Sequence, residues 1–231
     1  MVRALAPSAT VRAVVPYAFQ EEPDASGPRE RSDENWIVFV AGFGHPPNAE
    51  AARWFVRDVM PAVVARVPSA RFAIVGSSPP ASIEALGGPN VGIFANVTEA
   101  ELLGWYRRAA VAVVPLLSGA GVKLKTVEAL WHGLPVVLTP AGAQGLPGIQ
   151  NVVPVESDPG LFATEVADLL TDDALWHRSS AAQSAYARSR FSEAAQRESL
   201  RRALDIVAPP ASRRPAPRTK AKACTDTAAM A

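Results

Sequence analysis

Short apolar segments alternate with longer amphipathic ones along most of the chain, beginning at Trp36. The short segments are rich in Val, Ile and Phe and are bounded by Gly or Pro, which is typical of buried strands. The longer segments repeat apolar residues every three or four positions, which indicates helices. This alternation predicts an α/β fold with a doubly wound parallel sheet. About six strands are expected, at residues 36–40, 71–75, 91–94, 111–114, 135–138 and 152–155.

The helical pattern predicts one long helix at 48–67, with Asn48 as its N-cap. Thr98 and Glu101 have the spacing of a capping box, so a second helix is expected to start at Thr98. The other helices are expected at 125–131, 160–170, 173–188 and 192–207. Because ligands bind beyond the carboxyl ends of the strands in doubly wound sheets, the loops after the strands are the expected place of a site.

The regular pattern divides the chain into three parts. Residues 1–35 are expected to form an arm and linker, residues 36–207 the folded domain, and residues 208–231 a disordered basic tail rich in Pro, Ala, Ser and Arg. Five of the 23 basic residues and one of the 22 acidic residues lie in this tail, which leaves the rest of the chain at −3. A slightly acidic body argues against a nucleic-acid-binding surface.

Composition also limits the compartment and the kind of site. No apolar stretch approaches the ~20 residues of a transmembrane helix. Arg3 and Arg12 interrupt the region where a signal peptide would need an apolar run, so the cytoplasm is the expected compartment. The single cysteine, Cys224, has no disulfide partner in the chain, and the three histidines lack the spacing of metal ligands, so no metal site is expected.

The segment with the most chemical information follows the fourth predicted strand. Its small-residue loop at 118–121 precedes a helix that carries Lys125 and Glu128. Glycines let a backbone approach a ligand closely, and free N–H groups at a helix start attract anions. Lys125 and Glu128 are three residues apart and share a helix face, which offers a cation for a diphosphate and an acceptor for ribose hydroxyls. A surface ion pair beside a tight turn is the alternative interpretation.

Two well-known phosphate motifs fit this sequence incompletely. Residues 119–126 have the Walker A spacing, but Leu124 stands in place of the second glycine. The loop after the first strand begins like a dinucleotide fingerprint with Gly42 and Gly44, but Pro47 replaces the third glycine. Neither a P-loop NTPase nor an NAD-binding protein is therefore favoured.

Four motifs together carry a family resemblance: residues 40–48, residues 74–76, the segments 119–129 and 133–137, and the loop from Gly142 to Gly145. With them, residues 36–204 resemble the C-terminal, donor-binding half of the group 1 (family 4) glycosyltransferases of GT-B architecture. The resemblance implies a single Rossmann-like half-domain. It also implies a retaining hexosyltransferase type of enzyme that uses a nucleoside-diphosphate sugar as donor and needs no cofactor.

The resemblance also implies roles for individual residues. Glu128 corresponds to the second glutamate of the family's Glu-x7-Glu signature, which binds the ribose. The amides of Ser118, Gly119 and Gly121 are expected to face the diphosphate and sugar. Asn96, in the loop 95–97, is expected at the edge of the base. No catalytic residue is assigned.

The loop after the first strand has two further candidates. Gly44 is expected to let that loop approach the donor phosphates, as the resemblance implies. His45 is a candidate contact to phosphate or sugar, or else a surface residue.

The sequence departs from the family pattern in two places. Ala120 stands where the signature has its first glutamate, eight residues before Glu128. The segment 45–48 replaces the Arg and Lys that commonly follow the first strand. Lys123 or Lys125 is expected to supply the missing positive charge.

The acceptor-binding N-terminal half of such enzymes has no counterpart beyond residues 1–35, in which 14–17 resemble its last strand. The chain is therefore expected to be truncated, with a separate acceptor-binding lobe or protein as partner. The alternative is a non-catalytic module, from a truncated or split glycosyltransferase, that binds a nucleotide sugar or a partner. A flavodoxin-like or receiver-like regulatory fold is disfavoured because residues 41–48 contain no acid.

Overall fold

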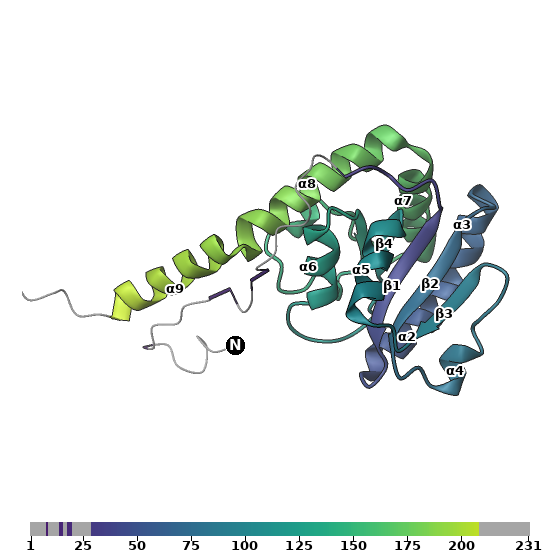
Figure 1. The fold of residues 1–231 in the computed structure, drawn as a ribbon, viewed down its shortest axis with the longest axis horizontal. Helices are drawn as coiled ribbons and strands as arrows, with labels where there is room; N and C mark the ends of the chain where they lie inside the picture. The colour runs from purple at the N-terminus through teal and green to yellow at the C-terminus, as the bar shows by residue number, and fades with distance from the viewer. Residues whose placement is uncertain (1–7, 9–13, 16–17, 20–28, 208–231) are drawn as a thin grey trace, which may run out of the picture.

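The computed structural model of the chain describes residues 8, 14, 15, 18, 19 and 29–207 (Figure 1). The predicted tail at 208–231 and most of the predicted arm lie outside the described residues. Of the predicted strand-like segment 14–17, only Val14 and Val15 are described, and neither is in a strand.

Five of the six predicted strands form one parallel sheet in the order β3-β2-β1-β4-β5 (Figure 1). Both faces of the central strands are covered, which is why these strands consist almost entirely of Val, Ile, Phe and Ala. The longest register joins β1 and β2, from Trp36 opposite Arg71 to Gly42 opposite Ser77. The strands are β1 Trp36–Gly42, β2 Arg71–Ser77, β3 Val91–Ala95, β4 Val111–Val114 and β5 Val136–Leu138.

The sixth predicted strand, at 152–155, is wrong. This segment makes a single parallel bridge, between Leu138 and Val155, and the sheet has five strands. The segment leaves a 3-10 turn at Ile149–Asn151, and the ψ angle of Val152 is −14°, which is not extended. Pro154 has no N–H to donate to a longer ladder. The pairing therefore stops after the bonds from Leu138 N to Pro154 O and from Glu156 N to Leu138 O.

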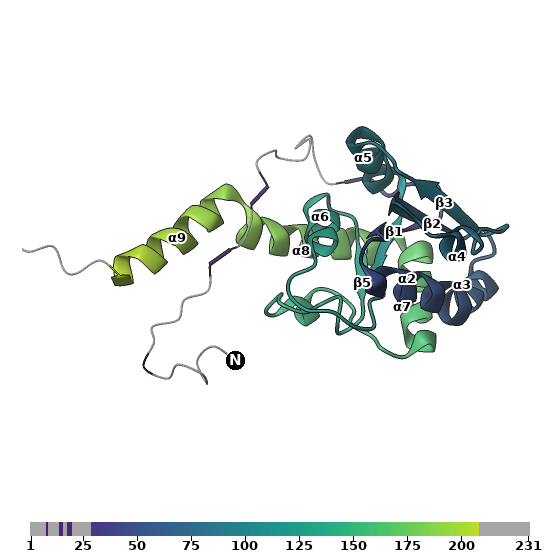
Figure 2. The same cartoon turned by 90° about the horizontal axis from the view of Figure 1, so that it is seen from below.

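Helices cover both faces of the sheet. α5 and α6 lie on one face, and α2, α3 and α7 lie on the other (Figure 2). α8 packs against α6 and leads into α9, which extends away from the sheet (Figure 1). The helices are α2 Pro46–Trp54, α3 Met60–Arg66, α4 Ala81–Glu84, α5 Glu99–Arg108, α6 Leu124–Trp131, α7 Pro159–Thr171, α8 Asp173–Phe191 and α9 Glu193–Val207.

The first predicted helix starts earlier than expected and is not uniform. Its N-cap is His45, followed by Pro46 at the first helical position, so Asn48 is not the cap. A π-helical segment, Phe55–Val59, separates α2 from α3. Pro61 follows this segment and cannot donate the next helical hydrogen bond, which gives the widened turn a physical cause.

The second predicted helix has the expected start. Thr98 and Glu101 form a complete capping box in front of α5, with Thr98 Oγ1 accepting from the N–H of Glu101 at 3.3 Å. The carboxylate of Glu101 accepts from the N–H of Thr98 at 2.7 Å, and this backbone hydrogen bond is the main reason that the pKa of Glu101 is lowered. The box therefore fixes the loop between β3 and α5.

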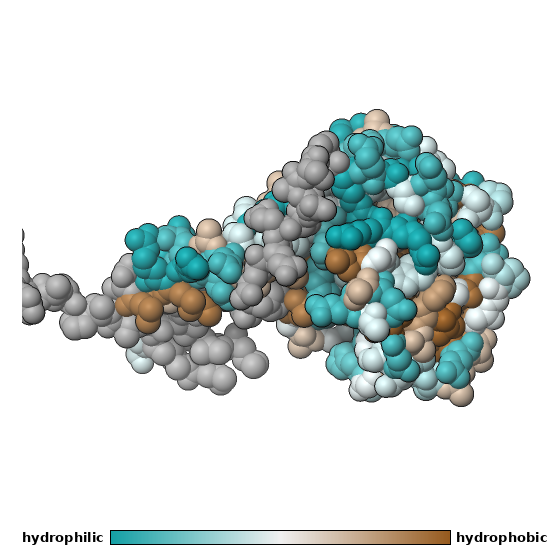
Figure 3. Space-filling model, viewed as in Figure 1, coloured by the Kyte–Doolittle hydropathy of each residue, from teal (hydrophilic) through white to brown (hydrophobic). Residues whose placement is uncertain are grey.

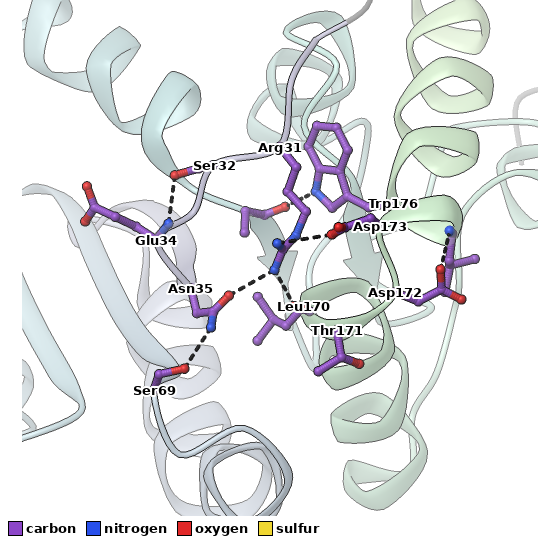
Figure 4. Close-up of polar contacts among 12 residues, drawn as sticks. Arg31, Ser32, Glu34, Asn35, Ser69, Leu170, Thr171, Asp172, Asp173 and Trp176 are labelled. Carbon is purple, nitrogen blue, oxygen red and sulfur yellow. Dashed lines mark hydrogen bonds and ion pairs between the residues drawn. The ribbon is translucent and has the colours of Figure 1, made fainter.

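The residues just before β1 make polar contacts with the end of α7 and the start of α8 (Figure 4). Arg31 forms an ion pair with Asp173 at 3.2 Å and donates hydrogen bonds to the carbonyl of Leu170 and the side chain of Asn35. Asn35 in turn donates to Ser69 at 2.8 Å. The described end of the predicted linker is therefore part of the packed body.

α9 has one apolar side that the described residues leave open. Leu200 and Leu204 are 44% and 67% exposed, and Figure 3 shows hydrophobic atoms along one side of this helix. Charged side chains occupy other positions of α9, where Glu198 forms ion pairs with Arg201 and Arg202.

Two glycines allow a matched test of how closely β1 and β2 pack. A Cβ on Gly76 would lie 1.8 Å from the carbonyl oxygen of Ala41, whereas a Cβ on the exposed Gly104 of α5 meets nothing within 4 Å. We expect Gly76→Ala to lower the free energy of unfolding by about 3 kcal/mol or more, because the backbones of β1 and β2 must separate. Gly104→Ala should raise it by about 0.5–1 kcal/mol through helix propensity. Urea unfolding measures both, and a wild-type midpoint for Gly76→Ala would contradict the close approach.

Candidate functional site

The predicted site residues gather at the carboxyl edge of the sheet. β1 pairs with β2 on one side and with β4 on the other, so the strand order reverses between β1 and β4. The loops that leave these two strands lie next to each other at such a switch point, where ligands bind in doubly wound folds. The candidates lie in the loops after β1, β3 and β4 and in the first turns of α6.

The loop after β4 has the open backbone that its composition predicts. Residues 118–121 are exposed, and Gly119 and Gly121 have φ angles of 126° and 77°, a region that favours glycine. Val122 and Lys123 separate this loop from α6, and Lys123 is the N-cap. The ammonium of Lys123 folds back to the carbonyl oxygen of Gly121 at 2.7 Å, and burial lowers the pKa of Lys123.

The loop after β5 packs against the residues on either side of this glycine loop. The hydroxyl of Thr139 is buried, donates to the carbonyl of Leu116 and accepts from the N–H of Gly142 at 3.2 Å. A Cβ on Gly145 would come within 2.8 Å of Val122. Sequence reasoning did not single out Thr139, although a hydroxyl directly after a buried strand is a usable signal.

Lys125 is the most unusual charge of the site. Its ammonium donates to the side-chain oxygen of Asn48 at 2.7 Å and lies 4.6 Å from the centre of the Phe39 ring. Asn48 is buried, and its amide donates to the carbonyl of Gly42 at 2.6 Å. Burial is the main reason that the pKa of Lys125 falls to about 7, although the carboxylate of Glu128 acts in the opposite direction. A lysine of α6 thus reaches the end of β1.

The sequence pattern predicted that Asn48 would cap a helix, but its side chain instead joins Lys125 to the carbonyl of Gly42. Asn48 shares the inward-facing side of α2 with Ala51 and Ala52, both of which are buried. A polar residue at an apolar position of a helical repeat is the signal that could have identified it.

Glu128 is held by a residue of α5. Its Oε2 accepts a hydrogen bond from the hydroxyl of Tyr106 in α5 at 2.9 Å. No ion pair joins Lys125 and Glu128, both of which are described, so the alternative of a simple surface pair is wrong. The two side chains contact different helices: Lys125 reaches Asn48 of α2, and Glu128 accepts from Tyr106 of α5. No sequence signal pointed to Tyr106.

The remaining candidates are exposed residues of the loops after β1 and β3. Gly44 and His45 are exposed, and nothing lies within 4 Å of a Cβ built on Gly44. Asn96 is exposed and has a φ of 54°, which is uncommon for a residue other than glycine. Its side-chain oxygen accepts from the N–H of Ser78 at 2.9 Å, so the loops after β2 and β3 are joined.

A groove of about 380 Å³ lies elsewhere, between α7, α8 and the segment before α7. None of the predicted site residues lines it. Within residues 29–207 and the few described before them, no cluster of three or more His, Cys, Asp or Glu side chains could hold a metal ion. In the same residues no helix is long and apolar enough to cross a membrane.

Comparison with known proteins adds a family to this geometry. A family profile described as "Glycosyl transferases group 1" matches residues 34–172. An uncharacterized 44.6 kDa protein in the cps region of Klebsiella pneumoniae is 28% identical over 140 residues, which cover 56% of this chain and 36% of that protein.

Solved structures confirm the fold class, an α/β domain equivalent to one half of the GT-B architecture. The sucrose-phosphate synthase of Thermosynechococcus elongatus matches with a TM-score of 0.59 and 22% identity over 76% of this chain and 47% of that one. The C-terminal domain of LpcC, a glycosyl transferase group 1 family protein from Francisella tularensis, matches with a TM-score of 0.52 and 15% identity over 78% of this chain and 97% of that domain. The chain therefore spans less than half the length of the Klebsiella pneumoniae protein and of the sucrose-phosphate synthase.

The lowered pKa of Lys125 makes stability depend on pH in a defined direction. Between pH 7 and 10.5 the unfolded chain holds the Lys125 proton while the folded chain releases it. The free energy of unfolding of the wild type, relative to Lys125→Met, should therefore rise as the pH rises through this range and stay constant below it. Urea unfolding of both proteins at several pH values measures this difference, and a constant difference from pH 7 to 10.5 would show that Lys125 keeps an ordinary pKa.

Proposed function

The chain belongs to the glycosyl transferases of group 1, and on this basis we propose that it is a donor-binding half that holds a nucleoside-diphosphate sugar. The observation that carries the proposal is the Lys125 ammonium at the switch point, fixed by Asn48 between the ends of β1 and β4. A half-buried cation beside an exposed glycine loop fits a pyrophosphate, because the anion restores the charged state that burial disfavours.

The other parts of the donor have places around this cation. The backbone amides of Ser118, Gly119 and Gly121 are exposed to the phosphates and the sugar, and Lys123 adds a second ammonium at the same loop. Glu128 accepts from the ribose hydroxyls on the side that faces α5. Asn96 and its loop lie beside the base, and Gly44 and His45 border the phosphates from the end of β1.

Transfer of the sugar with retained anomeric configuration needs a second lobe. The described residues contain one sheet, and its carboxyl edge is open to solvent, with Leu117 44% and Leu124 47% exposed beside the glycine loop. An acceptor-binding lobe that closes over this edge would cover both leucines and exclude water from the reacting bond. That lobe would bring the acceptor, whether it lies on the same polypeptide or on another.

A non-catalytic module that binds a nucleotide sugar is the second candidate. It is favoured by the single sheet of the described residues, which carries all the groups proposed to hold the donor while its carboxyl edge stays open to solvent. The two candidates predict the same donor affinity and differ only in turnover. A transfer and donor-hydrolysis assay separates them: turnover by the chain, alone or with an added acceptor lobe, indicates an enzyme, and binding without turnover in both cases indicates a module.

Donor binding itself has a direct test. UDP, GDP, ADP and CDP and their glucose conjugates are screened by thermal unfolding, and a ligand at about 100 times its Kd should stabilise the chain by about 2.7 kcal/mol. Lys125→Gln should weaken binding of the best ligand by about 10- to 100-fold, because it removes a charged hydrogen-bond donor to phosphate.

The matched control is Arg178→Gln, which removes the same charge from an exposed position at the distant groove. Its affinity should equal that of the wild type. If no ligand of the panel raises the unfolding temperature, or if Lys125→Gln and Arg178→Gln bind equally well, the proposed donor site is refuted.

A further inference from the structure

Tyr106 connects α5 to the carboxylate that is assigned to the ribose. We propose that Tyr106 is a positioning residue for nucleotide recognition, which holds one oxygen of Glu128 so that the other faces the ribose hydroxyls of the donor. The inference rests on the proposed function, since it requires Glu128 to bind ribose. It assigns to α5 a share in selecting ribonucleotides that no motif of the sequence reveals.

The contact between the two side chains is direct and sheltered. Tyr106 is 3% exposed, and its hydroxyl lies 2.9 Å from Oε2 of Glu128. Glu128 is half-buried and accepts no second side-chain hydrogen bond from the described residues. One oxygen is thereby fixed by the protein, and the acceptor capacity of the other is left for a ligand.

The Tyr106 ring packs against a second ring, that of His132. It stacks on His132 with ring centres 5.2 Å apart and an angle of 26° between the planes. Arg29, from the segment before β1, fixes the ends of both helices involved, because its guanidinium donates to the carbonyl oxygens of Arg107, Ala109 and His132. The phenol therefore has little freedom to turn away from Glu128.

The protonation states keep this arrangement constant near neutral pH. Burial, and then the charge of Glu128, raise the pKa of Tyr106 well above its ordinary value, so the phenol remains a donor. Burial, with Arg29 and Arg107, lowers the pKa of His132 to about 4, so the stacked ring stays uncharged. A neutral donor on a carboxylate leaves the negative charge available to polarise ribose hydroxyls.

The test compares ligands that differ only in the ribose. Kd is measured by calorimetry for UDP, GDP, ADP and CDP and for the 2′,3′-dideoxy form of each, on the wild type, Tyr106→Phe, Glu128→Gln and Tyr186→Phe. For the nucleotide that binds best, Tyr106→Phe should reduce the preference for the ribose form about 5- to 10-fold, with the affinity for the dideoxy form unchanged. A merely structural loss would weaken both forms equally.

Tyr186→Phe is the matched control, because it removes the hydrogen bond of another buried phenol, which donates to the carbonyl of Pro147 at 3.1 Å. Its ribose preference should stay at the wild-type value. If Glu128→Gln loses the preference while Tyr106→Phe keeps it, the positioning role is refuted and the donor site stands. If the wild type binds none of the nucleotides, both the donor site and the positioning role are refuted. If it binds them but prefers none over its dideoxy form, the ribose contact of Glu128 and the positioning role are refuted, and the donor site stands.

Discussion

The candidate site depends on a positive charge that folding holds partly out of water. The Lys125 ammonium has the oxygen of Asn48 and the face of Phe39 as neighbours, and these compensate only part of its lost hydration, as its pKa of about 7 indicates. An anion bound nearby would supply the rest. Binding of the anion then offsets the free-energy cost of partly burying the ammonium. The site is already arranged for the anion and need not reorganise when it binds. A fully exposed lysine would carry the same charge, but its ammonium would not be held in one position and would have no lost hydration for an anion to replace.

The charge can sit at this point because of the order of the strands. α2 and α6 lie on opposite faces of the sheet, but both begin at its carboxyl edge, after β1 and β4. Since β1 and β4 are neighbours, a side chain from the first turn of one helix can reach the first turn of the other. Lys125 and Asn48 use this proximity, and the segment after β1 therefore needs no basic residue of its own. Gly142 and Gly145 let the loop after β5 lie close to Val114 and Val122, on either side of the glycine loop.

The fold was largely predictable because its signals are local. Five strands, the capping box at Thr98 and the three consecutive C-terminal helices follow from hydrophobic period and end signals that lie within a few residues of each other. The errors arise where distant groups decide. Residues 152–155 have the composition of a strand, but the turn before them and Pro154 end their pairing. Asn48 has the identity of a cap, but Gly42 and Lys125 make it a buried bridge. Tyr106 could not be found, because only tertiary packing brings it to Glu128.

Binding and transfer place different demands on this chain. The groups proposed to hold a donor come from the loops after β1, β3 and β4 and from α6, all at the carboxyl edge of one sheet. Transfer also requires that water be kept from the reacting bond and that an acceptor be aligned with it. The glycine loop, Leu117 and Leu124 remain open to solvent, so neither requirement is met by the described residues alone. Affinity for the donor can therefore be complete in this half while turnover depends on what closes over the carboxyl edge.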